Sequence, residues 1–191
     1  MRRVVVSEFV TLDGVIEAPG GEFHPDGKGG WTMQFFDEEA GTFKFDELFA
    51  ADALLLGRVT YEHFAAAWPS MTDEAGFADR MNSLPKFVAS RTLKEPEWQN
   101  TTVIDGDTAA EIAKLKAESG QDILVAGSRQ LVQTLAQHDL VDEYRFLVYP
   151  VVLGSGKRLF GDGTHAPLKL RETKPFASGV VLLSYEPERS A

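Results

Sequence analysis

A short apolar run that stops at a glycine constrains the fold of this chain more than any other feature. Leu54–Leu56 is followed by Gly57-Arg58, and an amphipathic stretch begins within three residues. This pattern predicts a buried strand that ends at the N-terminus of a helix. A glycine at such a junction lets a ligand approach the backbone, and the free N–H groups of the helix, together with the arginine, favour a phosphate.

A second glycine junction has the same layout. The run Asp122–Ala126 is typical of a buried strand, and Gly127-Ser128 then opens an amphipathic helix. In a parallel sheet both junctions lie at the carboxyl edge, where ligands bind in open α/β folds. If the two strands are neighbours, the two helix N-termini can flank one pyrophosphate. The alternative is that each glycine only permits a tight turn.

A third junction bears on the choice of nucleotide. The predicted strand Lys86–Ala89 ends in Ser90-Arg91-Thr92, which offers a guanidinium and two hydroxyl groups. An NAD site usually places an acidic residue near the ribose 2′-hydroxyl, whereas a cation there suits a 2′-phosphate. Arg58 and Arg91 therefore favour NADPH over NADH. The alternative is that the arginine after the strand is simply solvated.

The remaining pattern predicts an α/β domain with a mixed sheet of about eight strands. Apolar residues at helical spacing precede and follow the first strand described above, and Trp68-Pro69 ends the second of these helices. Thr108 and Glu111 have the spacing of a capping box, and we expect Gly120 to end the helix that they begin. Further strands are predicted at residues 3–11, 102–104, from 143 onward, 168–174 and 179–186.

Composition limits the classes of protein that remain. The 191 residues, 43% of them hydrophobic, suit one soluble domain that spans residues 1–191. Lys plus Arg (19) against Asp plus Glu (29) gives a net charge of −10, which disfavours general binding to nucleic acid or an anionic membrane. Cysteine is absent and the four histidines are scattered, so we predict no metal site. No apolar run has the length of a signal peptide or a membrane span, and we expect a cytoplasmic protein.

Taken in order, the motifs resemble those of a known family. To the three junctions the chain adds Thr11–Gly14 and Tyr149–Gly156, and the whole set occurs in the order seen in dihydrofolate-reductase-like proteins. The chain is most similar to the reductase domain of the bifunctional riboflavin-biosynthesis deaminase-reductase and its stand-alone relatives. The resemblance implies a three-layer α/β fold, with helices on both faces of a mixed, mostly parallel sheet and an antiparallel C-terminal hairpin. It also implies NADPH as cofactor, a small-molecule substrate and a homodimer.

The resemblance also implies a cofactor site. The junction at Gly57 is implied to contact phosphate and ribose groups, and the junction at Gly127 is implied to contact the pyrophosphate. The turn that carries Arg91 is implied to contact the adenosine 2′-phosphate. Backbone contacts depend least on side-chain identity, so the two glycines carry this assignment most firmly. The residues so assigned are Gly57, Arg58, Thr60, Ser90, Arg91, Thr92, Gly127 and Ser128.

Two carboxylates are candidates for the catalytic acid, because reducing a C=N or C=O group requires a proton as well as a hydride. Asp13 is implied to sit in the loop over the nicotinamide and the substrate, although a simple Asp-Gly turn explains it equally well. Asp37 is followed by Glu38 and Glu39 before a helix, roughly where dihydrofolate reductase carries its substrate carboxylate. The plainer interpretation is an acidic helix start, favoured by the helix dipole.

Two further groups of residues are candidates for substrate contacts. Trp31 and Phe35 are suited to form an aromatic wall against a flat heterocycle, or else belong to the core. Lys28, Lys157 and Arg158 are the cations available for a substrate phosphate.

The sequence therefore predicts an NADPH-dependent oxidoreductase that reduces a small heterocyclic or phosphoribosyl-bearing substrate. One specific version acts on 5-amino-6-(5-phosphoribosylamino)uracil in riboflavin biosynthesis, and another resembles dihydrofolate reductase. The alternative, from a different class, is a nucleotide-binding or structural dimeric protein that has kept the fold without catalysis. Cofactor binding without turnover would indicate a binding protein, and no stabilisation by NADPH would indicate a structural one.

Overall fold

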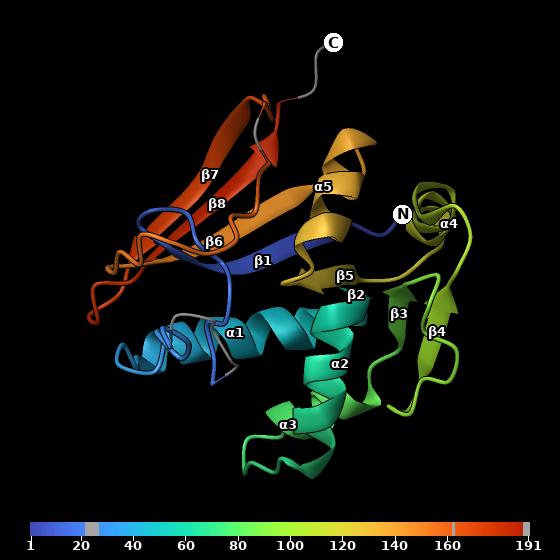
Figure 1. The fold of residues 1–191 in the computed structure, drawn as a ribbon, viewed down its shortest axis with the longest axis horizontal. Helices are drawn as coiled ribbons and strands as arrows, with labels where there is room; N and C mark the ends of the chain where they lie inside the picture. Colours follow the sequence, from blue (N-terminus) through green and yellow to red (C-terminus); the bar gives the residue numbers. More distant parts are fainter. Residues whose placement is uncertain (22–26, 162, 189–191) are drawn as a thin grey trace.

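Within residues 1–21, 27–161 and 163–188, which the computed structural model describes, eight strands form one sheet in the order β4-β3-β2-β5-β1-β6-β8-β7 (Figure 1). Strands β1 to β6 run parallel to one another, whereas β8 is antiparallel to both β6 and β7. The predicted mixed, mostly parallel sheet with an antiparallel C-terminal hairpin is therefore confirmed. The strands are β1 (Val4–Thr11), β2 (Ala51–Gly57), β3 (Lys86–Ala89), β4 (Thr101–Ile104), β5 (Asp122–Ala126), β6 (Glu143–Tyr149), β7 (Leu168–Pro175) and β8 (Val181–Pro187).

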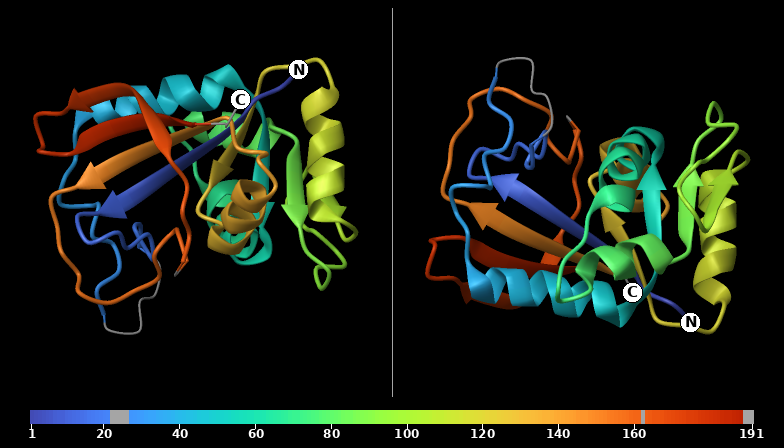
Figure 2. Two further views of the ribbon diagram at one scale, coloured as in Figure 1. Left: turned by 90° about the horizontal axis from the view of Figure 1, so that it is seen from above. Right: turned by 90° about the horizontal axis from the view of Figure 1, so that it is seen from below.

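Helices cover both faces of this sheet and give the fold its three layers (Figure 2). On the face of α4 and α5, Leu131 shares a core cluster with Val4 and Val6. On the face of α1, α2 and α3, Leu48 shares another with Val5. Successive residues of β1 thus face opposite layers, as the pleat of a strand requires. The helices are α1 (Glu38–Ala50), α2 (Arg58–Ala67), the short 3-10 helix η1 (Trp68–Ser70), α3 (Phe77–Ser83), α4 (Thr108–Ala117) and α5 (Arg129–Gln137).

The limits of α4 correct two details of the sequence prediction. Asp107 is the N-cap, because its side chain accepts a hydrogen bond from the N–H of Ala110 at 3.1 Å, and Thr108 is already the first helical residue. A carboxylate both accepts that bond and favours the positive end of the helix dipole, so Asp107 takes the capping position. The helix stops at Ala117 and not at Gly120, because the backbone becomes extended at the residue after Ala117.

Candidate functional site

The two glycine junctions lie side by side and hold each other in place. β2 and β5 are parallel neighbours, as the phosphate-site prediction required. The N–H of Gly57 donates to Ser128 Oγ at 2.9 Å, and the N–H of Ser128 donates to Thr60 Oγ1 at 2.9 Å. Each junction therefore contributes a side chain that fixes the backbone of the other. The two helix starts form one rigid unit at the carboxyl edge of the sheet.

The two glycines have different structural roles. Gly127 has a φ of +55°, and a Cβ there would lie 2.9 Å from Thr60 Oγ1, so the backbone and the packing both require glycine. Gly57 has a φ of −81°, and a Cβ would meet Ser128 at an ordinary 3.5 Å. Neither strain nor crowding within the chain requires a glycine at position 57, which fits close approach of a ligand.

The helix N-termini at this edge are unlike those of α1 and α4. Asp37 and Asp107 cap α1 and α4, respectively, with their side chains. Within the described part of the chain, α2 and α5 begin at Gly57 and Ser128 with no side-chain cap. Uncapped N–H groups at the positive end of a helix are a ready site for an anion. Both helices that meet at the glycine junctions thus have N-termini without a side-chain cap among the described residues.

The arginines predicted to bind phosphate differ in how far they are engaged. Arg58 donates to both oxygens of Glu62 on the same helix, at 2.7 and 2.9 Å, which offsets much of its charge. Arg91 is exposed, and its guanidinium has no hydrogen bond or ion pair within the described residues. Of these two arginines, Arg91 is therefore the one that, among the described residues, is free to meet a ligand.

The turn that carries Arg91 adjoins the glycine junctions. β3 is the other neighbour of β2, with Ala89 opposite Gly57, so both strands end at the same edge. Ser90 Oγ accepts hydrogen bonds from the N–H groups of Thr92 and Leu93 at 3.2 and 3.0 Å, which shapes the turn. Ser90 and Thr92 thus hold the loop that presents the arginine.

On the other side of β5 the sheet opens. β1 pairs with β5 only as far as Ser7, which lies opposite Ala126, while Glu8–Thr11 continue alongside β6. The β5-facing edge of β1 beyond Ser7 therefore has no strand partner among the described residues. Glu8 stands at the start of this opening and is 4% exposed. Its Oε1 is buried without a hydrogen-bond partner in the described structure.

Glu8 is a functional candidate that sequence reasoning missed. Burial raises its pKa well above the ordinary value, although the charge of Lys44 and the backbone N–H of Gly127 act in the opposite direction. The available signal was an acidic residue at the even positions of β1, among Val4, Val6 and Val10, which all point toward the α5 layer. A carboxyl group on the core-facing side of a strand is not exposed to water, so a partner or a function has to account for it.

A polar network that the sequence also did not predict lies on the α1 side of the opening. Lys44 Nζ donates to Ser7 Oγ at 2.8 Å and pairs with Glu47, which is 4% exposed. Arg145 in turn pairs with Glu47 at 3.3 Å and with Glu143 at 2.7 Å. These contacts join α1 to β1 and β6 beneath the opening and leave the buried carboxylate of Glu47 compensated.

Asp13 fastens a loop. Its carboxylate accepts hydrogen bonds from Thr11 Oγ1 at 2.7 Å, from the N–H of Leu153 at 3.2 Å and from the N–H of Gly154 at 2.8 Å. Chiefly the bond from Thr11, and then those two N–H groups, lower its pKa to about 2. A group held ionised in this way is a poor proton donor near neutral pH, and the catalytic role of Asp13 stays a prediction.

Asp37 is the N-cap of α1. One oxygen accepts from the N–H groups of Glu39 and Ala40, both at 3.0 Å, and the other from the N–H of Ser178 at 2.9 Å. These bonds lower its pKa, with that from Ala40 acting most. The geometry agrees with an acidic helix start that also holds the β7–β8 turn, and the catalytic role of Asp37 stays a prediction as well.

The aromatic candidates pack around Tyr149. Trp31, Phe35 and Phe9 meet its ring edge-on, with centroids at 5.3, 5.9 and 5.6 Å. Trp31 is 4% exposed and donates from Nε1 to the carbonyl of Glu17, so it belongs to the core.

The three cations considered for a substrate phosphate are all engaged in holding loops. Lys28 Nζ donates to the carbonyl of Leu153 at 2.7 Å, and Lys157 pairs with Glu17. Arg158 Nε donates to the carbonyl of Asp13 at 2.9 Å. A substrate phosphate would have to compete with these contacts.

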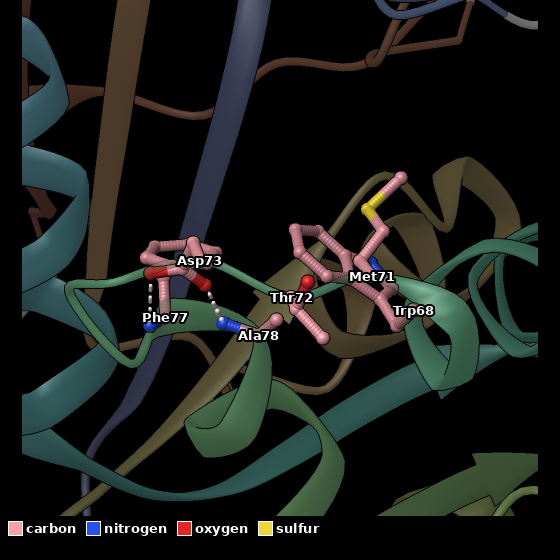
Figure 3. A pocket seen from close by; sticks show the side chains of 6 residues that line it. All are labelled: Trp68, Met71, Thr72, Asp73, Phe77 and Ala78. Carbon is pink, nitrogen blue, oxygen red and sulfur yellow. Dashed lines mark hydrogen bonds between the residues drawn. The ribbon is translucent and has the colours of Figure 1, made fainter.

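Neither of two surface hollows in the described structure is lined by the glycines of the two junctions. One, of about 380 Å³, lies between η1 and α3, and Figure 3 shows that its Asp73 is directed at the start of α3. That carboxylate accepts from the N–H groups of Phe77 and Ala78 at 2.9 and 2.6 Å, so each of its oxygens already binds the start of α3. The other, of about 470 Å³, lies beside α2 and has an acidic rim that does not suit a phosphate. Its acidic members are Glu62, Glu95 and Glu97.

Two further findings concern residues 1–21, 27–161 and 163–188. Among the side chains described there, no three of His, Asp or Glu gather in a way that could hold a metal ion. None of the helices in these ranges combines the length and the apolar character needed to cross a membrane.

Comparison with known proteins shows the family of the chain. The profile of the RibD C-terminal domain family matches residues 2–182. YyaP of Bacillus subtilis (strain 168) is 35% identical over 188 residues, which cover 96% of this chain and 94% of YyaP.

Two solved structures share the fold. The diaminohydroxyphosphoribosylaminopyrimidine deaminase/5-amino-6-(5-phosphoribosylamino)uracil reductase of Thermotoga maritima matches with a TM-score of 0.65 and 16% identity, over 97% of this chain and 56% of that one. Dihydrofolate reductase from Enterococcus faecalis, solved in complex with NADP(H), matches with a TM-score of 0.63 and 12% identity, over 98% and 97%. At these identities the likeness concerns the fold alone.

Proposed function

The chain belongs to the RibD C-terminal domain family, and from this premise we propose that it is an NADPH-dependent oxidoreductase. Its substrate is a small heterocyclic or phosphoribosyl-bearing molecule. Reductases of the same fold include the Thermotoga and Enterococcus enzymes, the second of which was solved with NADP(H). The homodimer predicted from the resemblance is part of the proposal, and sedimentation of the purified chain tests it.

One observation carries the proposal: the interlocked pair of glycine junctions. Two helix N-termini without caps converge there, and their backbone N–H groups are suited to the charge of a pyrophosphate. Gly57 leaves the backbone accessible, while Gly127 and Thr60 fit each other so closely that the geometry is rigid. These features fit the phosphates of a dinucleotide.

The strand order supports one orientation of such a cofactor along the edge of the sheet. Arg91 follows β3, on the far side of β2 from β5, and its free guanidinium suits a 2′-phosphate. The adenosine end therefore belongs over β3 and β2, and the pyrophosphate over Gly57 and Gly127. The nicotinamide end then belongs on the remaining side, at the opening between β5 and β1. Arg58 contributes less, because Glu62 holds it.

Each group in the reaction has a distinct task. NADPH supplies a hydride when it is bound. The chain's own residues bind the phosphates, orient the ring at the β5–β1 opening and hold the loop over it through Asp13. The proton is proposed to come from Asp13, Asp37 or a positioned water, and the lowered pKa of both carboxyl groups favours the water.

Two substrates represent the proposed class. The first is 5-amino-6-(5-phosphoribosylamino)uracil, supported by family membership and by the named activity of the Thermotoga enzyme. The second is dihydrofolate, supported by the fold of the Enterococcus enzyme. Because Lys28, Lys157 and Arg158 are engaged in loop contacts, the phosphate-free heterocycle needs fewer rearrangements.

Titration with NADPH and NADH tests the cofactor assignment. The wild type is expected to bind NADPH more tightly, and Arg91→Ala to weaken NADPH by about ten- to a hundredfold while leaving NADH nearly unchanged. Arg171→Ala is the matched control, because it removes the same charge from an exposed side chain on β7. Tighter binding of NADH would refute the cofactor, and equal loss of both would refute the role of Arg91.

A turnover assay with the two substrates then separates enzyme from binding protein. Oxidation of NADPH that depends on either substrate supports the reductase. Saturable NADPH binding without turnover of either supports the non-catalytic alternative. A ligand at a hundred times its Kd stabilises the folded state by about 2.7 kcal/mol, so an unchanged melting temperature would indicate a structural protein.

A further inference from the structure

Glu8 is the buried acidic group at the edge where the proposed cofactor ends. It is the first residue of β1 beyond the pairing with β5. It stands beside Gly127, whose backbone N–H favours the ionised form of its carboxyl group. Its Oε1 is covered and has no hydrogen-bond partner among the described residues. A buried polar atom of this kind costs free energy unless something pairs with it.

The charged neighbours of Glu8 do not pair with it. Lys44 on α1 is the nearest influence of opposite sign, but its Nζ is bound to Ser7 Oγ and to Glu47. Glu47, on the same helix, is of like sign and disfavours a second buried negative charge. On the side of β6, Glu8 lies opposite the apolar Phe146. The surroundings thus favour a neutral carboxylic acid at Glu8, a residue that stands where β1 runs on beyond β5 and whose Oε1 is unpaired among the described residues.

We propose that Glu8, as a neutral carboxylic acid, contacts the nicotinamide end of bound NADPH through its carboxamide group at the opening between β5 and β1. This inference rests on the proposed function and on the cofactor orientation given by the strand order. A carboxylic acid offers an O–H donor and a C=O acceptor, and a carboxamide offers the complementary N–H donor and C=O acceptor. A carboxylate would offer acceptors only and would place a second negative charge near the phosphates. Glu8 is then a specificity residue for the ring end of the cofactor.

Two substitutions and two ligands test this assignment. Glu8→Gln keeps a donor and an acceptor but cannot ionise, whereas Glu8→Leu has a similar size and neither group. NADPH is compared with 2′,5′-ADP, which carries the 2′-phosphate and lacks the nicotinamide ring. Glu8→Leu is expected to weaken NADPH by about tenfold or more while leaving 2′,5′-ADP unchanged. Glu8→Gln is expected to bind both ligands within about threefold of the wild type.

The outcomes separate failure of this inference from failure of the proposed function. If the wild type binds neither ligand, the proposed function falls and the inference falls with it. If the wild type binds both and Glu8→Leu still binds NADPH as tightly, only the inference is overturned. A loss in Glu8→Gln as large as in Glu8→Leu would also overturn it, because an ionised carboxylate would then be the contacting form. Thermal melting of each variant shows that the folded protein is being titrated.

Discussion

Replacing Gly57 with alanine separates ligand approach from backbone strain. The φ of −81° at this position is ordinary for alanine, and the new Cβ would meet Ser128 at 3.5 Å, a normal contact distance. The stability terms oppose each other. A less flexible unfolded chain favours the variant by about 0.4–1 kcal/mol, while alanine is a poorer N-cap than glycine by a similar amount. The free energy of unfolding should therefore change by less than about 1 kcal/mol.

The effect on binding should be much larger. The added methyl stands beside the uncapped start of α2, where the proposed pyrophosphate approaches the backbone. Moving the phosphate away weakens hydrogen bonds to a charged group, each contributing about 1.5–3 kcal/mol. The loss corresponds to about ten- to a hundredfold in the Kd for NADPH. Urea unfolding gives the stability change, and tryptophan fluorescence titration gives the affinity.

Gly127→Ala is the matched comparison. Here the φ of +55° strains an alanine by about 1–2 kcal/mol. The Cβ at 2.9 Å from Thr60 Oγ1 also disturbs the hydrogen bond from the N–H of Ser128, so the total destabilisation is about 2–3 kcal/mol. If Gly57→Ala binds NADPH like the wild type, no ligand approaches Gly57, and the reasoning that places the pyrophosphate there is refuted.

Two further predictions concern buried ionisable groups. Burial raises the pKa of Glu8, so above pH 4.5 the folded apoprotein binds more protons than the unfolded chain. The free energy of unfolding of the wild type, relative to that of Glu8→Gln, should therefore fall as the pH rises toward the folded pKa. The slope is at most about 1.4 kcal/mol per pH unit. Parallel urea unfolding curves at several pH values check this, and a constant difference would contradict it. Lys86 is fully buried and donates to the carbonyls of Asn82, Leu84 and Gln99, so Lys86→Met should destabilise the fold by about 2–4 kcal/mol. A loss under about 1 kcal/mol would show that these carbonyls find other donors.

Much of the fold could be predicted from local pattern. Strands such as β5 and β6 and the helices between the parallel strands agree with the expected ranges to within about a turn. The errors occurred where neighbouring residues competed, as when Asp107 capped α4 in place of Thr108. Side-chain capping is decided by which oxygen reaches the free N–H groups, and spacing alone does not settle that.

The candidate site was predictable only in part. The glycine junctions and Arg91 carry local signatures, so they could be found one at a time. Their contacts with each other could not, because the bond from the N–H of Ser128 to Thr60 joins residues 68 positions apart. The ion pair between Arg58 and Glu62 is local, because the two residues lie four positions apart on one helix. Whether it forms still depends on which other groups the folded chain brings near Arg58.

The sequence by itself determined the α/β class and the strand-to-helix junctions, because periodicity and turn chemistry act over a few residues, and its ordered motifs indicated the family by resemblance. Only the tertiary structure decided that β2 and β5 are neighbours, so that two open helix starts face one place. It also decided that β1 outruns β5, which leaves Glu8 buried beside Gly127 with an unpaired oxygen. Strand order and burial depend on contacts across the whole chain, and the charge state of a carboxyl follows from that burial.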